Sequence, residues 1–387
     1  MMKQRLLSLL LILTMTLTPA ALAEQPGPAL VDGGLELSGS SVHYPQLTGM
    51  ADEVLQQQLN DRILAAGDIE NRLTRLALLM QSPVSMQVTY RATMAGDVLS
   101  CVFSALGAVT DERATHVWSA VNVDLADGSD IAFDRLFTDE EGLRRDLEEC
   151  LDYGVGPELS AHLRNSELTP VPEVFGLTET GLTLYYPMEQ LSTLSDRAGA
   201  VTILWYELRE HLRREDDDIL TRIGARDMLV PAPDSGEKIR AAVEAGTLPG
   251  VPVTLGGSVQ EATDTYRMLT DPDLYQDGRM FALEDAAFRQ VWLLTDALTE
   301  KTWDKSVIKG LRADRFNLWG LYPGLDRQAV EAMLGQPDTV LTLDADMADA
   351  YRLVPGESLY YNYTGVQLRL HFDAEGLLTS LIITQAA

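Results

Sequence analysis

The sequence predicts an α+β fold: an N-terminal domain of antiparallel sheets with packed helices, followed by a domain of two helix-plus-antiparallel-sheet units. Three observations predict it. Apolar residues alternate with polar ones over residues 84–137, the period of two that half-buried strands show. Apolar residues recur at helical spacing over residues 54–64 and 69–80. After residues 231–236, which are rich in proline, the pattern of helices and strands changes, which indicates a second domain.

Residues 1–23 are predicted to be a secretory signal peptide. Lys3 and Arg5 precede an apolar run over residues 6–17, and residues 21–23 (Ala-Leu-Ala) form a small-x-small cleavage site. The apolar run is shorter than the roughly 20 residues that a spanning helix needs, so we expect no membrane span after cleavage; retention as an anchor is the open alternative. We therefore expect an extracytoplasmic protein, either secreted or in the cell envelope.

The chain is strongly acidic. It has 30 Lys+Arg against 58 Asp+Glu, for a formal net charge of −28. Such a surface repels nucleic acid and anionic phospholipid, which argues against both as partners. It favours a cationic protein as a partner, or bound metal ions, and solubility outside the cell is the simpler explanation of the charge.

The chain has two cysteines, Cys101 on a predicted strand and Cys150 on a predicted helix. Outside the cell they could form one disulfide. Both positions also suit a buried free thiol, so the sequence leaves the two states open.

In the N-terminal domain we expect extended chain at residues 35–37 and then 41–49, forming a short edge strand. A helix that ends at Gly67 and a second helix over residues 69–80 follow. A meander of about four strands follows over residues 84–137, in which Asp127 and Gly128 form a tight turn before the last strand.

Beyond the meander we expect a helix over residues 138–153, then two strands that flank a turn at Glu179 and Thr180. A strand over residues 200–205 and a charged helix over residues 206–214 complete the domain. The expected organisation is therefore a signal peptide at 1–23, an α+β domain at 24–230, a linker at 231–250 and a repeat domain at 251–387.

The repeat domain contains two similar units. In the second, Asp326 caps a helix that ends at Gly335 before Pro337, and three strands follow over residues 358–363, 366–372 and 377–384. In the first, a helix begins near Val259 and strands follow over residues 279–283 and 288–293. We expect the two units to form one continuous sheet.

Residues 42–212 resemble the RsiV-like extracytoplasmic domain, a domain of unknown function found in lysozyme-binding anti-sigma factors and ahead of some peptidoglycan deacetylases. The matching features, in chain order, are residues 44–49 (Tyr-Pro-Gln-Leu-Thr-Gly), Asn60, residues 97–100, Thr115 and His116, Val123 and Asp124, Asp127 and Gly128, residues 133–137, Phe175, residues 181–187 and Gly199. The C-terminal units more faintly resemble the BamE-like and β-lactamase-inhibitor-like modules, through Gly324, Val330 and residues 334–337.

These resemblances imply a non-catalytic bacterial envelope protein that binds a protein such as lysozyme, or peptidoglycan. A signal peptide stands where the anti-sigma factors have a sigma-binding segment and a membrane helix, so sigma-factor regulation is not expected. The alternatives are a cell-wall hydrolase or deacetylase whose site the sequence does not mark, and a purely structural envelope protein.

No motif in the sequence selects catalytic residues, and we expect no cofactor and no metal. The five histidines are scattered, with His43 and His116 as the pair that might meet. Asp124, Asp127 and Asp130 have calcium-loop spacing but no later bidentate Glu, so a hairpin turn is favoured. The ligand-binding candidates are His116, Trp118, Tyr185 and Tyr186, because an aromatic residue on a strand faces either the core or a ligand.

Overall fold

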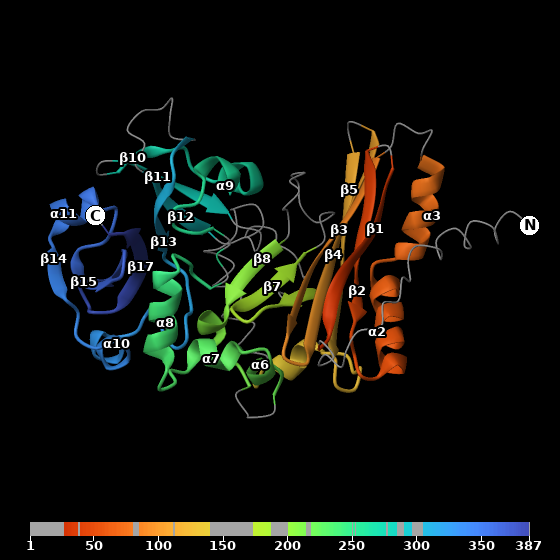
Figure 1. The fold of residues 1–387 in the computed structure, drawn as a ribbon, viewed down its shortest axis with the longest axis horizontal. Helices are drawn as coiled ribbons and strands as arrows, with labels where there is room; N and C mark the ends of the chain where they lie inside the picture. The colour runs from red at the N-terminus through yellow and green to blue at the C-terminus, as the bar shows by residue number, and fades with distance from the viewer. Residues whose placement is uncertain are drawn as a thin grey trace, which may run out of the picture.

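The structure, a computed structural model, describes residues 27–37, 39–79, 85–110, 113–139, 173–186, 200–213, 218–249, 251, 253–275, 278–284, 290–295 and 305–386. It confirms the α+β class, with three sheets and helices packed on them (Figure 1). The predicted signal peptide, the predicted helix at 138–153 and Cys150 lie outside the described residues.

The N-terminal sheet has five strands in the order β1-β2-β3-β4-β5. They are β1 (Ala29–Leu37), β2 (Ser40–Thr48), β3 (Ser85–Ala95), β4 (Val98–Thr110) and β5 (Arg113–Asp124). The prediction that residues 41–49 form an edge strand is wrong, because β1 pairs along the outer side of β2. The β2 and β3 strands pair in parallel, since two helices cross over between them.

Those helices, α2 (Glu53–Ala66) and α3 (Ile69–Leu79), cover one face of the sheet (Figure 1). The carboxylate of Asp52 caps α2 by accepting from two backbone N–H groups, and α2 ends at Gly67 as predicted. Asn60 fixes α2 to β2, because its Oδ1 accepts from Leu47 N at 2.7 Å and its Nδ2 donates to Leu47 O at 2.9 Å. Leu59 and Phe103 are among the buried residues between helices and sheet.

The meander has three strands, β3, β4 and β5, and the prediction of a fourth over residues 131–137 is wrong. Gly128, with φ of +75°, turns the chain after β5, and a 3₁₀ helix, η1 (Phe133–Leu136), follows. A strand would send successive side chains to opposite faces. The 3₁₀ turn instead lets Ile131, Leu136 and Phe137 all reach one core.

A three-stranded antiparallel sheet packs on the other face of the five-stranded sheet. Its strands are β6 (Val174–Leu177), β7 (Gly181–Tyr185) and β8 (Ala200–Leu204), at the predicted positions. The short helices η3 (Trp205–Leu208), α6 (Ile219–Arg222) and α7 (Ala225–Leu229) follow. A 3₁₀ turn thus stands where the sequence predicted a charged helix, because Trp205, Tyr206 and Leu208 are all buried.

The C-terminal half forms one sheet of nine strands, which confirms the predicted continuous sheet. The main order is β10-β11-β12-β13-β17-β16-β15-β14, and β9 pairs with β11. The strands are β9 (Arg267–Met268), β10 (Asp273–Tyr275), β11 (Gly278–Glu284), β12 (Gln290–Thr295), β13 (Ile308–Ala313), β14 (Thr339–Leu343), β15 (Gly356–Tyr363), β16 (Val366–Asp373) and β17 (Leu378–Gln385). The helices are α8 (Ser235–Glu244), α9 (Val259–Thr265), α10 (Arg327–Leu334) and α11 (Ala345–Ala350).

The two units of this sheet share the same local construction. Ser258 caps α9 and Asp326 caps α10, each by accepting from a backbone N–H three residues on. In the first unit, the carbonyl oxygen of Gly257, just before α9, accepts from the backbone N–H of Ile308 at the start of β13. In the second unit, the carbonyl oxygen of Leu325, just before α10, accepts from the backbone N–H of Leu378 at the start of β17. These last strands, β13 and β17, pair antiparallel at the middle of the sheet. The units are therefore related by an approximate two-fold axis between β13 and β17.

Residues 231–250, expected as a linker, contain α8. Ile239 and Val243 of this helix are fully buried in the core of the nine-stranded sheet. The chain thus joins the C-terminal core from about Ser235, instead of crossing a free linker. Among the described residues, no helix is long and apolar enough to cross a membrane.

Candidate ligand-binding site

The second face of the five-stranded sheet is only partly covered by β6, β7 and β8. Where β6 covers it, Ser100 Oγ accepts from Leu177 N at 2.8 Å and Asn122 Nδ2 donates to Phe175 O at 2.9 Å. Ser100 Oγ also donates to Asn122 Oδ1 at 2.6 Å. These bonds fix the small sheet on one half of the face.

The other half of the face carries polar and aromatic side chains. Gln87, Thr89 and Arg91 project from β3 and are exposed. On β4 and β5, Ser104 lies opposite Trp118 in the register. Directly opposite residues of antiparallel strands share a face, so Trp118 belongs to this surface.

Three of the four predicted ligand-binding residues come together here. The ring centroids of His116 and Trp118 are 4.2 Å apart, and those of Trp118 and Tyr185 are 4.6 Å apart. His116 and Trp118 are two residues apart on β5, whereas Tyr185 comes from the end of β7. The three rings form a row, defined here as the aromatic row, with the half-buried Trp118 at its centre.

His116 is held in place by a hydroxyl. Its Nε2 lies 2.7 Å from Ser104 Oγ on the neighbouring strand, and the imidazole is buried. A serine hydroxyl beside an imidazole is also the contact that a nucleophile and its base would make. This pair is therefore where an enzymatic function would be sought.

Tyr185 and its neighbour Tyr186 point to opposite sides of β7, as a strand requires. Burial raises the pKa of Tyr185, against the hydrogen bonds of Arg91 and Thr183 to its hydroxyl, which lower it. Tyr186 is buried in the core that contains Phe175 and Trp205. It therefore lies away from the aromatic row and has a packing role.

The indole of Trp118 has an unused donor. Its Nε1 is buried and has no hydrogen-bond partner among the described residues. A buried donor without an acceptor costs free energy, and native proteins rarely leave one. Because Nε1 is buried while Trp118 as a whole is half-buried, the part of this side chain that a ligand can reach is the ring.

His43 does not meet His116. It lies on β2, and β3 and β4 separate that strand from β5. Its Nδ1 lies 3.2 Å from Asp32 Oδ2 and its Nε2 lies 3.4 Å from Glu36 Oε1, both on β1. His43 therefore joins the edge strand to its neighbour.

The acidic residues of the turn after β5 have structural partners. Asp124 pairs with Arg222 at 2.7 Å, Asp127 accepts from Ser129 N at 2.8 Å, and Asp130 pairs with Arg62. Burial alone would raise the pKa of Asp124, but the hydrogen bonds from Arg222 and Ala126 N lower it overall. Among the described residues no group of three or more His, Cys, Asp or Glu could hold a metal ion.

Cys101 is buried in the core under α2 and α3, and it forms no disulfide with any residue that the structure describes. Burial raises the pKa of this thiol to about 12, so it stays protonated and unreactive at neutral pH. Its possible partner, Cys150, lies outside the described residues, so the disulfide and the free thiol both stay open.

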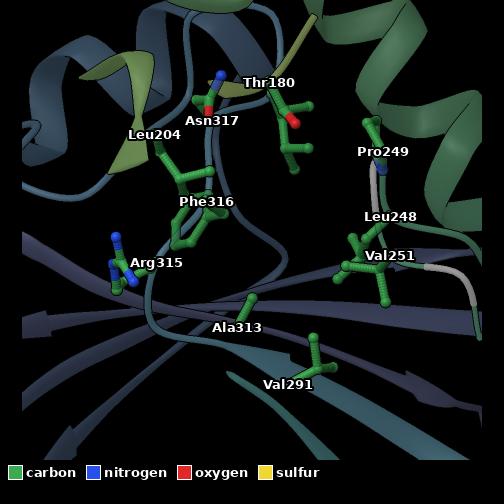
Figure 2. Close-up of a pocket in the computed structure, with 11 residues that line it drawn as sticks. Thr180, Leu204, Leu248, Pro249, Val251, Val291, Ala313, Arg315, Phe316 and Asn317 are labelled. Atoms are coloured by element: carbon green, nitrogen blue, oxygen red, sulfur yellow. The ribbon is translucent and has the colours of Figure 1, made fainter. Parts of the chain in front are cut away.

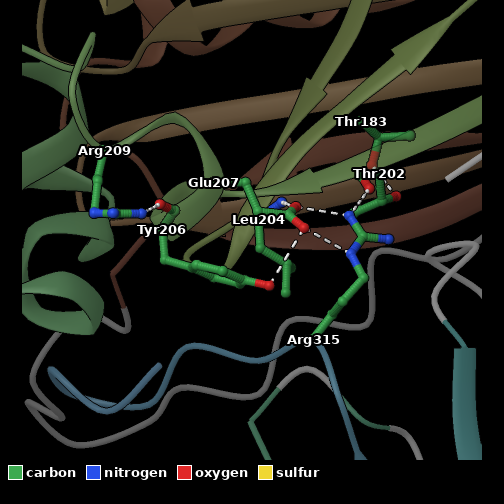
Figure 3. A network of polar contacts seen from close by, with 7 residues as sticks. All are labelled: Thr183, Thr202, Leu204, Tyr206, Glu207, Arg209 and Arg315. Carbon is green, nitrogen blue, oxygen red and sulfur yellow. Dashed lines mark hydrogen bonds and ion pairs between the residues drawn. The ribbon is translucent and has the colours of Figure 1, made fainter. Parts of the chain in front are cut away.

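A second group of polar residues lies where the three-stranded sheet meets the nine-stranded sheet. A pocket opens there, lined by residues of both (Figure 2). Beside it, Arg315 donates from Nε to Glu207 Oε1 at 2.7 Å and from Nη2 to Glu207 Oε2 at 2.6 Å (Figure 3). Arg315 Nη2 also donates to Thr202 O at 2.9 Å. This bidentate pair ties η3 and β8 to the segment after β13.

No protein-family model matches the chain, and no curated protein matches it. Among solved structures, a DUF3298 family member from Bacteroides fragilis is similar, with 16% identity and a TM-score of 0.37 over 51% of this chain and 95% of that one. A DUF3298 family protein from Pseudomonas aeruginosa has 11% identity and a TM-score of 0.34, over 49% and 95%. A DUF4309 family protein from Bacillus subtilis has 11% identity and a TM-score of 0.27, over 40% and 98%. These neighbours are bacterial domains of unknown function, and at these scores the likeness indicates no function for this chain.

The sequence did not mark the residues at the junction. Arg315 and Glu207 are 108 positions apart, and nothing near either residue in sequence distinguishes it from the other charged residues. One signal was available: Trp319 and Gly320 follow Asn317, and an X-Gly pair between apolar residues predicts a tight turn. That turn presents Arg315 and Asn317 to the smaller sheet.

Proposed function

We propose that this chain is a non-catalytic binding protein of the bacterial envelope, and that the aromatic row holds a saccharide of the cell-wall polymer. The observation that carries the proposal is the row itself, with the half-buried ring of Trp118 at its centre. The flat, apolar face of a sugar ring packs on aromatic rings, and its hydroxyl and carbonyl oxygens accept from amide and guanidinium N–H groups.

The surroundings of the row fit an uncharged, oxygen-rich ligand. Gln87, Thr89 and Ser104 supply amide and hydroxyl groups on the same face. Arg91 is the charged residue of this group, and it is exposed. A cationic protein would need carboxylates at the contact, so this surface favours a saccharide over lysozyme, although the net charge of the chain favours lysozyme at long range.

The resemblance of residues 42–212 to the RsiV-like domain supports an extracytoplasmic role, as does the predicted signal peptide at residues 1–23. Several motif residues of that resemblance have structural roles. Asn60 joins α2 to β2, and Asp124 pairs with Arg222. The motif thus describes the scaffold, while the aromatic row supplies the binding surface of the proposal.

The test is binding of the mature chain to purified, insoluble peptidoglycan and to soluble glycan fragments, followed by sedimentation and by tryptophan fluorescence. We expect Trp118→Ala to weaken binding by about tenfold or more, the loss of a central aromatic contact. Val117→Ala is the matched control. Val117 is 49% exposed and points to the opposite face of β5, so its variant should bind like the wild type.

Unfolding midpoints of both variants show whether the fold survives. Equal binding by Trp118→Ala and the wild type would refute the site. Binding to lysozyme without binding to glycan would refute the saccharide and assign the chain to a protein partner. If the chain released soluble fragments from peptidoglycan and Ser104→Ala abolished the release, the proposal that the protein is non-catalytic would be refuted. That result would support the hydrolase alternative.

A further inference from the structure

The strand β5 has an open edge beside a groove. In the five-stranded sheet β5 pairs with β4 on one side, and no described strand pairs along its other side. A groove of about 560 Å³ lies there, lined by residues that include Ala65 and Ala66 of α2, Ala120 of β5 and Phe175 of β6. Because α2 and β6 cover opposite faces of the sheet, a groove that both of them line lies at the sheet edge. Its volume is within the range of known ligand sites, roughly 300–1,000 Å³.

The backbone of β5 directs unused hydrogen-bonding groups from this edge. In an antiparallel pair, every second residue points both its N–H and its C=O away from the neighbouring strand. Asn122 is such a residue, because its carbonyl oxygen accepts from Ile131 N at 2.9 Å. The register with β4 has no shift between Asn122 and Trp118, so Ala120 and Trp118 point outward in the same way. Their outward N–H and C=O groups have no hydrogen-bond partner among the described residues.

The chain itself begins a further strand beside β5 and then leaves it. Asp130 forms an antiparallel bridge with Val123, next to the bond between Ile131 and Asn122. The chain then turns into η1, which begins at Phe133, and the groove lies at this point of departure. The position beyond the bridge is therefore open to a second polypeptide that continues the pairing along β5.

The side chains of β5 do not protect its edge. Proteins usually guard an edge strand with charged residues, prolines or bulges. Residues 117–123 (Val-Trp-Ser-Ala-Val-Asn-Val) contain no charge and no proline, and their register with β4 has no bulge. The edge strand on the other side of the sheet, β1, carries Asp32 and Glu36 around two glycines. Of these two edges, β5 is the one suited to pairing.

The charge of the groove favours a cationic partner. Its described lining contains one cation, Arg62, and two anions, Asp130 and Glu173. Arg62 pairs with Asp130. Glu173 is exposed and has no ion pair among the described residues. The unpaired charge is therefore negative, and the net charge of −28 attracts a cation from further away.

We propose that the edge of β5 binds an extended segment of another protein that carries a lysine or arginine side chain. The segment adds a strand to the sheet and exchanges four backbone hydrogen bonds with Ala120 and Trp118. Ala120 lies on the same face of β5 as Asn122, whose Nδ2 donates to Phe175 O of β6. A cationic residue paired with Ala120 therefore extends toward β6, where Glu173 precedes the strand. This site uses the backbone of β5 and not the aromatic rings, so it goes beyond the function proposed above.

The test uses a heptapeptide probe, acetyl-Thr-Val-Thr-Lys-Thr-Val-Thr-amide with a fluorescent label, and the anisotropy of that label on titration with the mature chain. Two further versions carry backbone N-methyl groups, one on the second, fourth and sixth residues and the other on the third and fifth. A strand presents alternate N–H groups to opposite edges, and only one edge of the probe can face β5. We expect one version to bind like the parent and the other at least about tenfold more weakly. Equal binding of the two versions would overturn the proposal.

Variants of the chain test the strand edge and the charge separately. Ala120→Pro removes an outward N–H but no bond to β4, so it should weaken binding of the probe at least about tenfold, whereas Ala120→Ser keeps the N–H and should bind like the wild type. The probe should bind about two- to fivefold more tightly than its analogue with glutamine for lysine. Glu173→Gln should abolish this preference, and Glu237→Gln, on the exposed surface of α8, should retain it.

Several results would overturn the proposal. Full binding of the probe by Ala120→Pro would exclude the edge, and an unchanged lysine preference in Glu173→Gln would exclude the charge. A dimer of the mature chain that Ala120→Pro makes monomeric, with no binding of the probe, would assign the edge to a second copy. If Ala120→Pro does not fold, the N-methylated probes and Glu173→Gln still decide. Glycan binding is measured separately, so either proposal can fail while the other holds.

Discussion

Replacing Arg315 by Met should weaken the connection between the two halves of the molecule. The guanidinium makes two bonds to Glu207, at 2.7 and 2.6 Å, and one to the Thr202 carbonyl at 2.9 Å, while Met keeps most of the aliphatic stem. Hydrogen bonds to charged groups contribute about 1.5–3 kcal/mol each when buried, and exposed ion pairs about 0.2–1 kcal/mol in total. With side chains 35% exposed for Arg315 and 16% for Glu207, this pair lies between those cases. We expect the free energy of unfolding to fall by about 2–3 kcal/mol.

A double-mutant cycle with Glu207→Gln isolates the pair from the other contacts of each residue. Urea unfolding of the wild type, both single variants and the double variant should give a coupling energy of about 1.5 kcal/mol or more. Arg240→Met is the control. Arg240 is 57% exposed, and its contacts, an ion pair with Glu244 along α8 and the ring of Tyr363 with its centroid 5.4 Å away, both lie at the surface, so the change should cost about 1 kcal/mol or less. A coupling below about 0.5 kcal/mol would refute the reasoning, since that is the value of an exposed pair.

Two further predictions concern buried titratable groups. His371 is buried and its pKa is lowered, first by burial and further by the charges of Arg369 and Arg312. As pH falls below about 6.5, the unfolded chain therefore takes up a proton at this residue before the folded chain does. His371 should for this reason lower the free energy of unfolding by up to about 1.4 kcal/mol for each pH unit below that value. Urea unfolding between pH 8 and 5 should show that His371→Gln removes this dependence. Cys101, with the pKa of its thiol raised to about 12, should resist iodoacetamide at pH 8 in the native protein. Mass spectrometry after treatment in denaturant without reductant tests the disulfide to Cys150. Alkylated Cys101 would contradict the disulfide, and unmodified Cys101 would support it.

Elements with local signals were predictable from the sequence, and elements that depend on distant partners were not. Asp326 caps its helix as the sequence indicated, because a cap is a contact with the next three residues. Of β1, the sequence indicated only residues 35–37. Val31 and Leu35 are exposed, so no buried face marks this strand in the sequence, and pairing with β2 holds it in place. The helix α8 was hidden by the prolines before it, although Ile239 and Val243 have helical spacing.

The candidate site likewise has one part that local sequence patterns predict and one part that depends on distant residues. The period of two puts His116 and Trp118 on one face of β5, and this much follows from the sequence. That Tyr185 completes the row depends on how the three-stranded sheet lies across the larger one, which no local pattern encodes. The unused donor of Trp118 is a property of packing, so only the structure could reveal it.

The approximate two-fold symmetry of the C-terminal half explains why the junction features occur in one place. Both units repeat the capped helix and the bond from the start of the last strand back to the helix entry. After β13 the chain continues through Arg315 and Asn317 to the turn at Trp319 and Gly320. That turn donates from Gly320 N to Met228 O, on α7. The repeat therefore builds the sheet, and the segment after β13 makes the ion pair to the N-terminal half. Variants at Arg315 should accordingly affect the junction while the repeated caps and strand register stay intact.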